Sequence, residues 1–350
     1  MGSFDDPPPD HLSALAQHGT WAEVRPLLRP ILCPTTYKQA ARDDLLHRWP
    51  EAAEIDTRFL SRPAFPFVDE LVAIDLPDAR SVINYSTLAL WSVSADEVFA
   101  AARENLESLV QPHDPRGNAI LTRTDRDGSA YLTSWPLAPG WLASFSRRYA
   151  GRLVVFIPDI DTLIVVPDIP HLLARIYRQV EQQYVDARHR LSPQCYTLDA
   201  DDTVVSFDRA GRHEQHRTAV RAGYRLAMWE YAVQAHWLNR ALQRDLEFTR
   251  YDLEMAIVGE IKLAGTDTHP FTYTVWGQSV DYLLPAADYI SFASTDADNN
   301  AVPFCTVPLT AALEITGLTL IPAMSPIRFE ARFWPDETML TQLKRASVTL

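Results

Sequence analysis

Three arginines recur at the spacing of one helical turn, in the segment with the longest helical pattern of the chain. Arg217, Arg221 and Arg225 stand four residues apart, so a helix places them on one face. Guanidinium groups bind carboxylates and phosphates through paired hydrogen bonds, and a row of them could hold an anionic ligand or an acidic partner surface. A charged row on a helix is more often solvated surface, and that alternative stays open.

Four polar side chains of the central segment form a second candidate site. They are Asn105, Asn118, Asp127 and Asp161. If they converge at one end of the predicted sheet, they line a polar pocket for a hydrolase-type enzyme or for a small ligand. If they are separate turn and cap residues, the enzyme hypothesis fails.

Two short patterns resemble fragments of metal sites. Asp159 and Asp161 belong to a tight acidic turn, where oxygens suit hard cations, but an Asp in such a turn normally hydrogen-bonds its own backbone. His213 and His216 have helical spacing, but they do not form the H-E-x-x-H pattern of zinc enzymes. We therefore expect no metal site.

Signatures of nucleotide binding and of covalent catalysis are missing from the sequence. The chain contains neither G-x-x-x-x-G-K-[ST] nor G-x-G-x-x-G, and no serine stands in G-x-S-x-G. We expect no cofactor, and the sequence leaves open whether the protein is an enzyme. A non-enzymatic binding or adaptor protein is the first hypothesis, and an enzyme is the second.

The cysteines and the basic residues bear on the compartment and the source. Cys33, Cys195 and Cys305 are far apart and in no C-x-x-C pair, so they indicate neither a disulfide framework nor a zinc knuckle. A reducing cytoplasm fits this pattern. Only three of the 32 basic residues are lysines, which we interpret as the mark of a GC-rich bacterial genome.

Length, composition and net charge restrict the class of fold and the kinds of partner. The chain has 350 residues, of which 47% are hydrophobic and 22% are charged, as expected for a folded protein of about two domains. Its formal net charge of -13 argues against binding to nucleic acid or to an anionic membrane. The longest apolar runs fall far short of the roughly 20 residues that cross a bilayer, so we expect no membrane association.

Periodicity divides the chain into five segments. We expect a disordered tail over residues 1–10, a helical cap over 11–66, an α+β domain over 67–208, a bridging helix over 214–246 and a second α+β domain over 247–350. Both domains are predicted to hold mainly antiparallel sheets. The expected fold class is therefore α+β, with two mixed domains joined by a long amphipathic helix.

The central domain carries the clearest local signals. Ser94 and Glu97 form a capping box that begins a helix. Residues 120–124 and 130–135 flank an Asp-Gly turn and predict a hairpin, and two apolar runs around an acidic turn predict a second hairpin over 153–166. Helices are expected over residues 95–110, 140–149 and 170–187.

The predicted bridging helix is apolar on two sides. Its second apolar side carries Trp229, Val233 and Trp237. Such a helix is normally buried between layers or in a subunit interface, and aromatic residues with arginine are typical of interface hot spots. We therefore expect a protein partner or a homo-oligomer through this helix.

After this helix the hydrophobic period changes to two. Residues 253–263 and 327–333 alternate between apolar and charged side chains. This pattern predicts amphipathic strands, with Arg328 and its charged neighbours on the wet face of a sheet. A last helix is expected over residues 337–344.

Seven short motifs of the central segment occur in a shared order. They are AIDLP (73–77), AARENL (101–106), GN (117–118), DG (127–128), VVFIP (154–158), DTLI (161–164) and LSPQCY (191–196). In this order they resemble the YtpQ-like family of bacterial proteins, a domain of unknown function, over about residues 55–207. The chain departs from the family at Tyr131 to Ser134 and at Asp159, where the family often carries His or Arg. The resemblance implies an α+β domain and a bacterial setting, but no activity.

Overall fold

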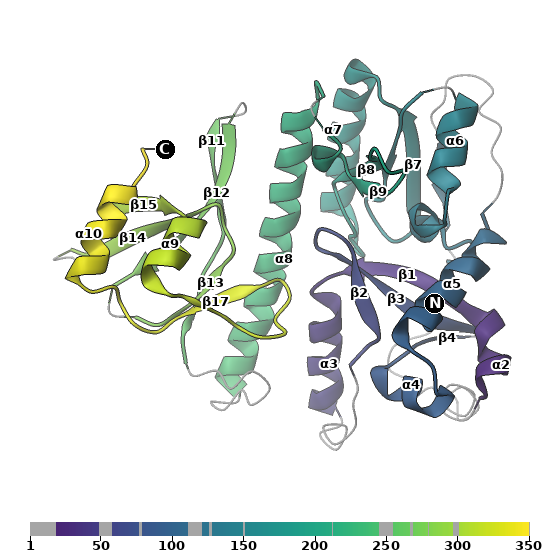
Figure 1. Cartoon of the computed structure of the whole chain (residues 1–350), viewed down its shortest axis with the longest axis horizontal. Helices are drawn as coiled ribbons and strands as arrows, with labels where there is room; N and C mark the ends of the chain where they lie inside the picture. Colours follow the sequence, from purple (N-terminus) through teal and green to yellow (C-terminus); the bar gives the residue numbers. More distant parts are fainter. Residues whose placement is uncertain are drawn as a thin grey trace. The chain divides into compact units, whose positions relative to one another are not determined.

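A computed structural model places most of the chain in two compact units, unit 1 over residues 1–222 and unit 2 over residues 223–350 (Figure 1). The structure describes residues 19–48, 58–76, 79–110, 121–125, 128–149, 151–211, 213–244, 255–266, 269–278, 280–296 and 301–349. Helices accompany sheets whose strands are mainly antiparallel, so the predicted α+β class is confirmed. The tail over residues 1–10 lies outside the described residues, and the domain boundaries stay predictions.

Unit 1 opens with short helices and a four-stranded antiparallel sheet. β3 lies between β1 and β2 and also pairs with β4. The helical elements are α2 (Trp21–Val24), η1 (Arg25–Leu27) and α3 (Tyr37–Arg48), and the strands are β1 (Leu28–Pro34), β2 (Ser61–Phe65), β3 (Val68–Leu76) and β4 (Ala79–Val82).

The expected helical cap over residues 11–66 is wrong where β1 and β2 form. Residues of β1 alternate between buried and half-buried from Leu28 to Leu32, which is the period of a strand. Pro30 lacks the N–H that a helix interior needs. The pairing of β1 with β3 joins residues far apart in sequence, and no local pattern reveals it.

α5 (Ala95–Glu107) begins at the predicted capping box and packs on this sheet. Ser94 Oγ accepts a hydrogen bond from the Glu97 main-chain N–H at 3.3 Å, and the Glu97 carboxylate accepts one from the Ser94 main-chain N–H at 2.8 Å. Val98, Ala102 and Leu106, which are four residues apart on this helix, are fully buried. α4 (Tyr85–Trp91) precedes this helix.

A five-stranded antiparallel sheet forms the second half of unit 1, in the order β5-β7-β6-β8-β9. Its strands are β5 (Leu121–Thr124), β6 (Leu153–Phe156), β7 (Thr162–Pro167), β8 (Cys195–Leu198) and β9 (Val204–Ser206). The predicted hairpin over residues 153–166 is confirmed as β6 and β7. Both strands are buried along their whole length, as their unbroken apolar runs indicate.

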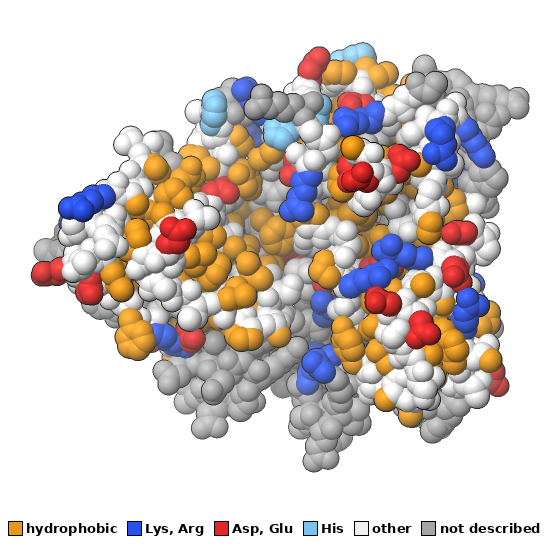
Figure 2. Space-filling model, viewed as in Figure 1, with side chains coloured by type: hydrophobic (Ala, Val, Ile, Leu, Met, Phe, Trp, Pro, Cys, Tyr) orange, Lys and Arg blue, Asp and Glu red, His pale blue; other side chains and the backbone are white. Residues whose placement is uncertain are grey.

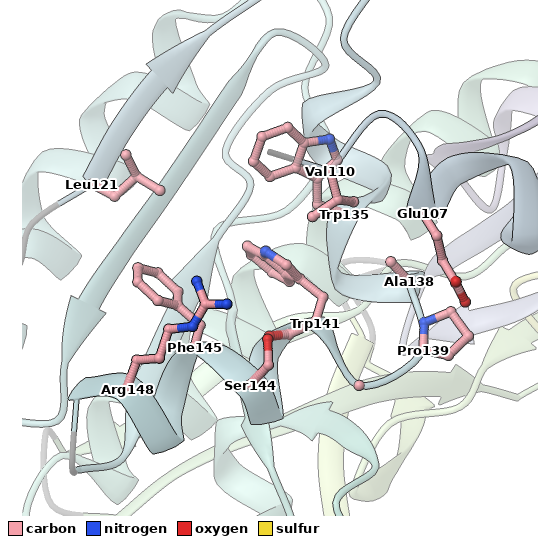
Figure 3. A pocket seen from close by; sticks show the side chains of 11 residues that line it. Glu107, Val110, Leu121, Trp135, Ala138, Pro139, Trp141, Ser144, Phe145 and Arg148 are labelled. Atoms are coloured by element: carbon pink, nitrogen blue, oxygen red, sulfur yellow. The ribbon is translucent and has the colours of Figure 1, made fainter. Parts of the chain in front are cut away.

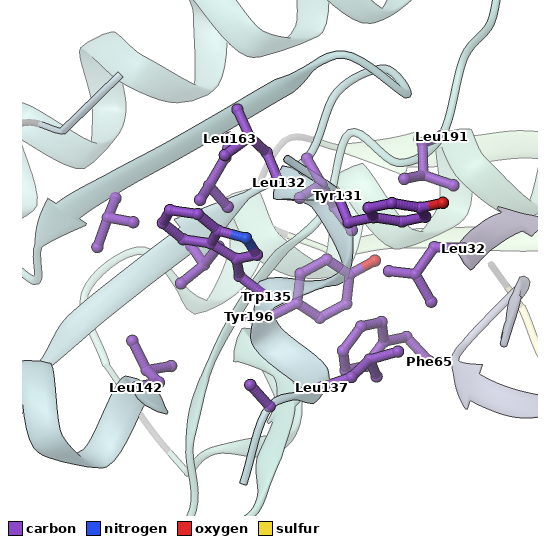
Figure 4. Packing of buried hydrophobic residues seen from close by; sticks show 14 of the residues in the cluster. Leu32, Phe65, Tyr131, Leu132, Trp135, Leu137, Leu142, Leu163, Leu191 and Tyr196 are labelled. Carbon is purple, nitrogen blue, oxygen red and sulfur yellow. The ribbon is translucent and has the colours of Figure 1, made fainter. Parts of the chain in front are cut away.

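The two faces of this sheet bury different partners. Val155 and Val165 pack against η3 (Leu132–Leu137) and α6 (Trp141–Tyr149) in the cluster of Figure 4. Val154 and Val166 pack on the other side against α7 (Pro170–Asp186). Side chains of a strand alternate between faces, so one apolar strand supplies both cores. Helices predicted over 140–149 and 170–187 are thus confirmed.

The predicted hairpin of residues 120–124 with 130–135 is wrong. β5 pairs with β7 instead, and residues 132–137 form the 3-10 helix η3. Tyr131 before it adopts the left-handed conformation with φ of 51°, and Pro136 within it cannot donate to a strand ladder. All residues of η3 are buried. Their packing in the core therefore determines the local structure, and the alternation of apolar residues that predicted a strand does not.

α8 (His216–Arg244) is the longest helix of the described residues and matches the helix predicted over 214–246. The boundary between the two units falls inside it, between Ala222 and Gly223. Ala219 and Ala222 belong to the core beneath α7, and Leu238 belongs to a core of unit 2. Its role as a joining element stays a prediction.

The described residues of unit 2 form two four-stranded sheets and, besides α8, two helices. The sheet orders are β10-β13-β17-β16 and β11-β12-β14-β15, with parallel pairing only at β10/β13 and β12/β14 among the described strands. The elements are β10 (Ile257–Val258), β11 (Lys262–Thr266), β12 (His269–Gly277), β13 (Tyr282–Pro285), β14 (Tyr289–Thr295), β15 (Ala301–Pro308), α9 (Leu309–Thr316), β16 (Thr319–Leu320), β17 (Arg328–Ala331) and α10 (Glu337–Ala346).

Arg328 corrects the expectation of a wet face on β17. Its side chain is 0% exposed, whereas Phe333, expected inside, is 89% exposed. The guanidinium donates to Gln234 Oε1 at 2.6 Å and to the carbonyl oxygens of Gly259 at 2.8 Å and Leu283 at 2.7 Å. A buried arginine is tolerated because these oxygens replace its hydration. Figure 2 shows apolar side chains on the visible face of unit 2.

None of the helices within the described residues is long and apolar enough to span a bilayer.

Candidate functional site

Unit 1 contains an open cavity of about 320 Å³ between α5, β5, η3 and α6 (Figure 3). Its lining is mainly apolar and aromatic, with three polar side chains. The lining residues are Glu107, Val110, Leu121, Trp135, Ala138, Pro139, Gly140, Trp141, Ser144, Phe145 and Arg148. A volume at this scale suits a small organic molecule, since ligand sites in proteins occupy about 300–1,000 Å³.

One face of α6 supplies much of the wall. Trp141, Phe145 and Arg148 stand at positions i, i+4 and i+7, so the helix presents them in a row. The helix begins directly after Gly140, which has a φ of 66°. This left-handed conformation favours glycine, and it turns the chain from η3 into α6.

The aromatic side chains form two walls at a steep angle. The rings of Trp135 and Trp141 meet edge to face, with centroids 5.9 Å apart and planes at 75°. Phe145 extends the second wall, with its centroid 6.3 Å from that of Trp141. Trp135 is fixed from behind, because it is 1% exposed and its Nε1–H donates to the Ala130 carbonyl at 2.9 Å.

The indole N–H of Trp141 has a different status. It makes no hydrogen bond with any described residue. It is also absent from the buried polar atoms that lack a partner in the described chain, so the nitrogen is accessible at the surface. The Trp141 side chain is half-buried, so this donor remains available to a molecule in the cavity.

Two charged side chains stand at the rim. Arg148 and Glu107 are both exposed, and neither forms an ion pair with a described residue. Figure 3 shows Arg148 beside Phe145 and Glu107 beside Pro139, at different ends of the lining. The rim therefore carries a negative charge at the end of Glu107 and a positive charge at the end of Arg148. Ser144 is already engaged, because its Oγ donates to the Trp141 carbonyl at 2.8 Å.

Of the four polar residues of the second sequence hypothesis, the two that the structure describes, Asn105 and Asp161, do not line this cavity. Asn105 joins α5 to the chain before it, because its Nδ2 donates to the main-chain carbonyl oxygens of Arg25 at 2.6 Å and Leu28 at 3.1 Å. Asp161 sits in the turn between β6 and β7, where its carbonyl accepts from the Asp125 N–H at 2.8 Å. Asn118 and Asp127 lie outside the described residues.

The acidic turn has the structural role that competed with metal binding. Asp159 Oδ1 accepts the Asp161 main-chain N–H at 2.9 Å, and its Oδ2 accepts from Gln183 Nε2 at 2.7 Å. His213 stacks on Phe207 with centroids 3.6 Å apart. Among the described residues no group of three or more His, Cys, Asp or Glu side chains could hold a metal ion.

The three arginines of the first hypothesis lie on α8 as predicted. Arg217 is exposed, and Arg221 and Arg225 are half-buried. The unit boundary separates Arg225 from the other two. Their role in binding stays a prediction.

The buried thiol of Cys195 is not an activated nucleophile. Its Sγ lies 2.8 Å from the Tyr177 hydroxyl, in a core built mainly of apolar side chains. Burial raises the pKa of both groups well above their ordinary values, so both are neutral at physiological pH.

Sequence reasoning predicted the short helix of α6 but missed the cavity beside it. Trp141, Phe145 and Arg148 carry a readable signal, an aromatic and cationic row at helical spacing. Trp135 carries none, because it belongs to η3, which was mistaken for a strand. The chain matches no protein-family model, no curated protein and no solved structure, so the YtpQ-like resemblance stays a prediction.

Proposed function

We propose that this chain is a binding protein and that it binds a small organic ligand in the cavity of unit 1. The observation that carries the proposal is the aromatic lining of the cavity, in which Trp141 contacts Trp135 edge to face and Phe145 on its other side. Aromatic walls stabilise a flat apolar ligand by burying its surface and by ring contacts of about 0.5–1.5 kcal/mol each.

The chemistry of the lining supports binding over catalysis. The described lining includes no His, Cys or Asp, and the hydroxyl of Ser144 donates to a main-chain carbonyl instead of to a base. General acid–base and nucleophilic mechanisms need such groups within hydrogen-bond reach of each other. Neither Asn105 nor Asp161 lines this cavity, and the Asn105 side chain donates to main-chain carbonyl oxygens, so the two do not support a hydrolase-type site here.

A protein partner, or a second copy of the chain, bound through α8 is a second proposal. Arg217 is exposed on this helix, and Trp229 is 41% exposed. Arginine and tryptophan are among the residues most often found at the energetic centre of protein interfaces.

The three free cysteines of the chain and its shortage of lysine support a setting in a bacterial cytoplasm.

The test is ligand-observed NMR with neutral indole as the probe. We expect magnetisation transfer from the full chain to indole, a strong reduction with Trp141→Ala, and no reduction with Trp229→Ala, which removes an exposed tryptophan outside the cavity. Absence of transfer with the unaltered chain, or equal transfer with Trp141→Ala, contradicts the proposal.

A further inference from the structure

We infer that the ligand of this cavity is a planar aromatic anion, with its ring against Trp141 and its negative group on Arg148. The inference rests on the proposed function and adds the chemical class of the ligand. The observation behind it is that Arg148, the cationic side chain of the described lining, makes no ion pair with a described residue.

The first step is the position of Arg148 relative to the aromatic wall. It stands three residues after Phe145 and seven after Trp141, so α6 places the three side chains on one face. A ring that stacks along this face ends beside the guanidinium. Because guanidinium is planar and always charged, it binds a carboxylate through two parallel hydrogen bonds.

The second step is the lack of a competing anion at Arg148. The acidic side chain of the described lining is Glu107, which comes from α5 and forms no ion pair with Arg148. Figure 3 shows it at the end of the cavity beside Pro139. A bound anion therefore does not have to displace an ion-pair partner of Arg148 from among the described residues.

The third step is orientation. Glu107 repels a negative group at its own end and Arg148 attracts one, so an anionic ligand has one favoured direction in the cavity. The indole N–H of Trp141, which makes no hydrogen bond with a described residue, offers one further donor to a polar atom of the ligand. A cation would meet the reverse situation, because the guanidinium stands at the end of the aromatic wall.

The experiment compares three probes of one shape and different charge by isothermal titration at low salt. They are indole-3-propionate, its neutral amide and tryptamine. We expect the anion to bind about fivefold more tightly than the amide, since one partly solvated ion pair contributes up to about that factor. Tryptamine should bind more weakly than the amide.

The matched variants are Arg148→Gln and Arg147→Gln. Both arginines are exposed neighbours on α6, but only Arg148 lines the cavity. Arg148→Gln should abolish the preference for the anion over the amide, whereas Arg147→Gln should retain this preference.

Each other result overturns the inference. Equal binding of anion and amide to the unaltered chain removes the anionic class while the binding function stands. Loss of the preference in both variants assigns it to the general field of the helix instead of to Arg148. Failure of all three probes to bind removes the inference and the proposed function together.

Discussion

The ring of Trp141 meets the ring of Trp135 edge to face, with 5.9 Å between centroids and 75° between planes. The two tryptophans come from different elements, η3 and α6, and only Trp135 is part of the buried core. One residue thus supports the fold and the other is available to a ligand.

This division predicts unequal effects on stability. Trp135→Ala should lower the free energy of unfolding by about 3–5 kcal/mol, because it empties a fully buried site and frees the Ala130 carbonyl. Trp141→Ala should lower it by less than about 2 kcal/mol, since this ring is only half-buried. Urea denaturation measures both values. Equal losses would contradict the assignment of separate roles.

Glu70 is predicted to be the main ionic support of the first sheet. Its carboxylate is 0% exposed and accepts from Arg62 Nε at 2.7 Å and from Arg103 Nε and Nη2 at 2.9 and 2.6 Å. Glu70→Gln should destabilise unit 1 by about 3 kcal/mol, because removing the charge leaves two guanidinium groups without their anion.

The control for this variant is Glu104→Gln on the same helix as Arg103. Glu104 pairs with Arg25 at 2.7 Å, but the two side chains are 61% and 50% exposed. Exposed pairs contribute less than about 1 kcal/mol, so this variant should unfold nearly as the unaltered chain does. A Glu70→Gln variant as stable as Glu104→Gln would show that the buried network contributes little.

His213 is predicted to make the stability of unit 1 depend on pH. Burial against Phe207 lowers the pKa of His213 below its ordinary value of 6.5, an effect only partly opposed by the Phe207 carbonyl and by Asp168. The unfolded chain therefore binds a proton at His213 more readily than the folded chain. The contribution of neutral His213 to the free energy of unfolding is fully present above pH 6.5 and decreases as the pH falls below that value.

The measurement is the urea midpoint of the unaltered chain and of His213→Gln between about pH 7.5 and about pH 5.5. The variant lacks this titration, so its midpoint should fall less over the same interval. The nearby Arg152, Asp168 and His216 are present in both proteins. An equal fall in the two proteins would exclude His213 as the cause.

The arginines of α8 give a prediction about partners. Changing Arg217, Arg221 and Arg225 together to Gln should keep the chain folded, with a small loss of stability at the half-buried Arg221 and Arg225, and should abolish salt-sensitive retention on polyglutamate beads. Unfolding of this variant would mean that the side chains are structural, and unchanged retention would mean that they are solvated surface. The control carries the same charge change at exposed arginines elsewhere in unit 1, namely Arg175, Arg178 and Arg188.

Elements with a strong local signal were predictable from the sequence. The capping box of Ser94 and Glu97 fixes the start of α5, and two apolar runs around an acidic turn fix the β6–β7 hairpin. The long period-3.6 stripe gives α8 within two residues at each end. In each case residues close in sequence determine the structure, so one sequence carries enough information.

Elements that depend on distant contacts were not predictable. β1 needs β3 as its partner, and β5 needs β7. Arg328 looks like a surface charge until Gln234 and two carbonyl oxygens from other elements surround it. The cavity has the same origin, since Glu107, Trp135 and Arg148 come from three elements that only tertiary packing brings together.

The central claim is that a small aromatic ligand binds in the cavity lined by Trp135 and Trp141. The most direct measurement is a ¹H–¹⁵N NMR titration of the full chain with indole-3-propionate that follows the tryptophan indole N–H signals, assigned by single Trp→Phe variants. The account predicts that the signals of Trp141 and Trp135 shift in a saturable manner while that of Trp229 stays in place. A titration in which neither cavity signal moves, or in which Trp229 alone moves, would contradict it.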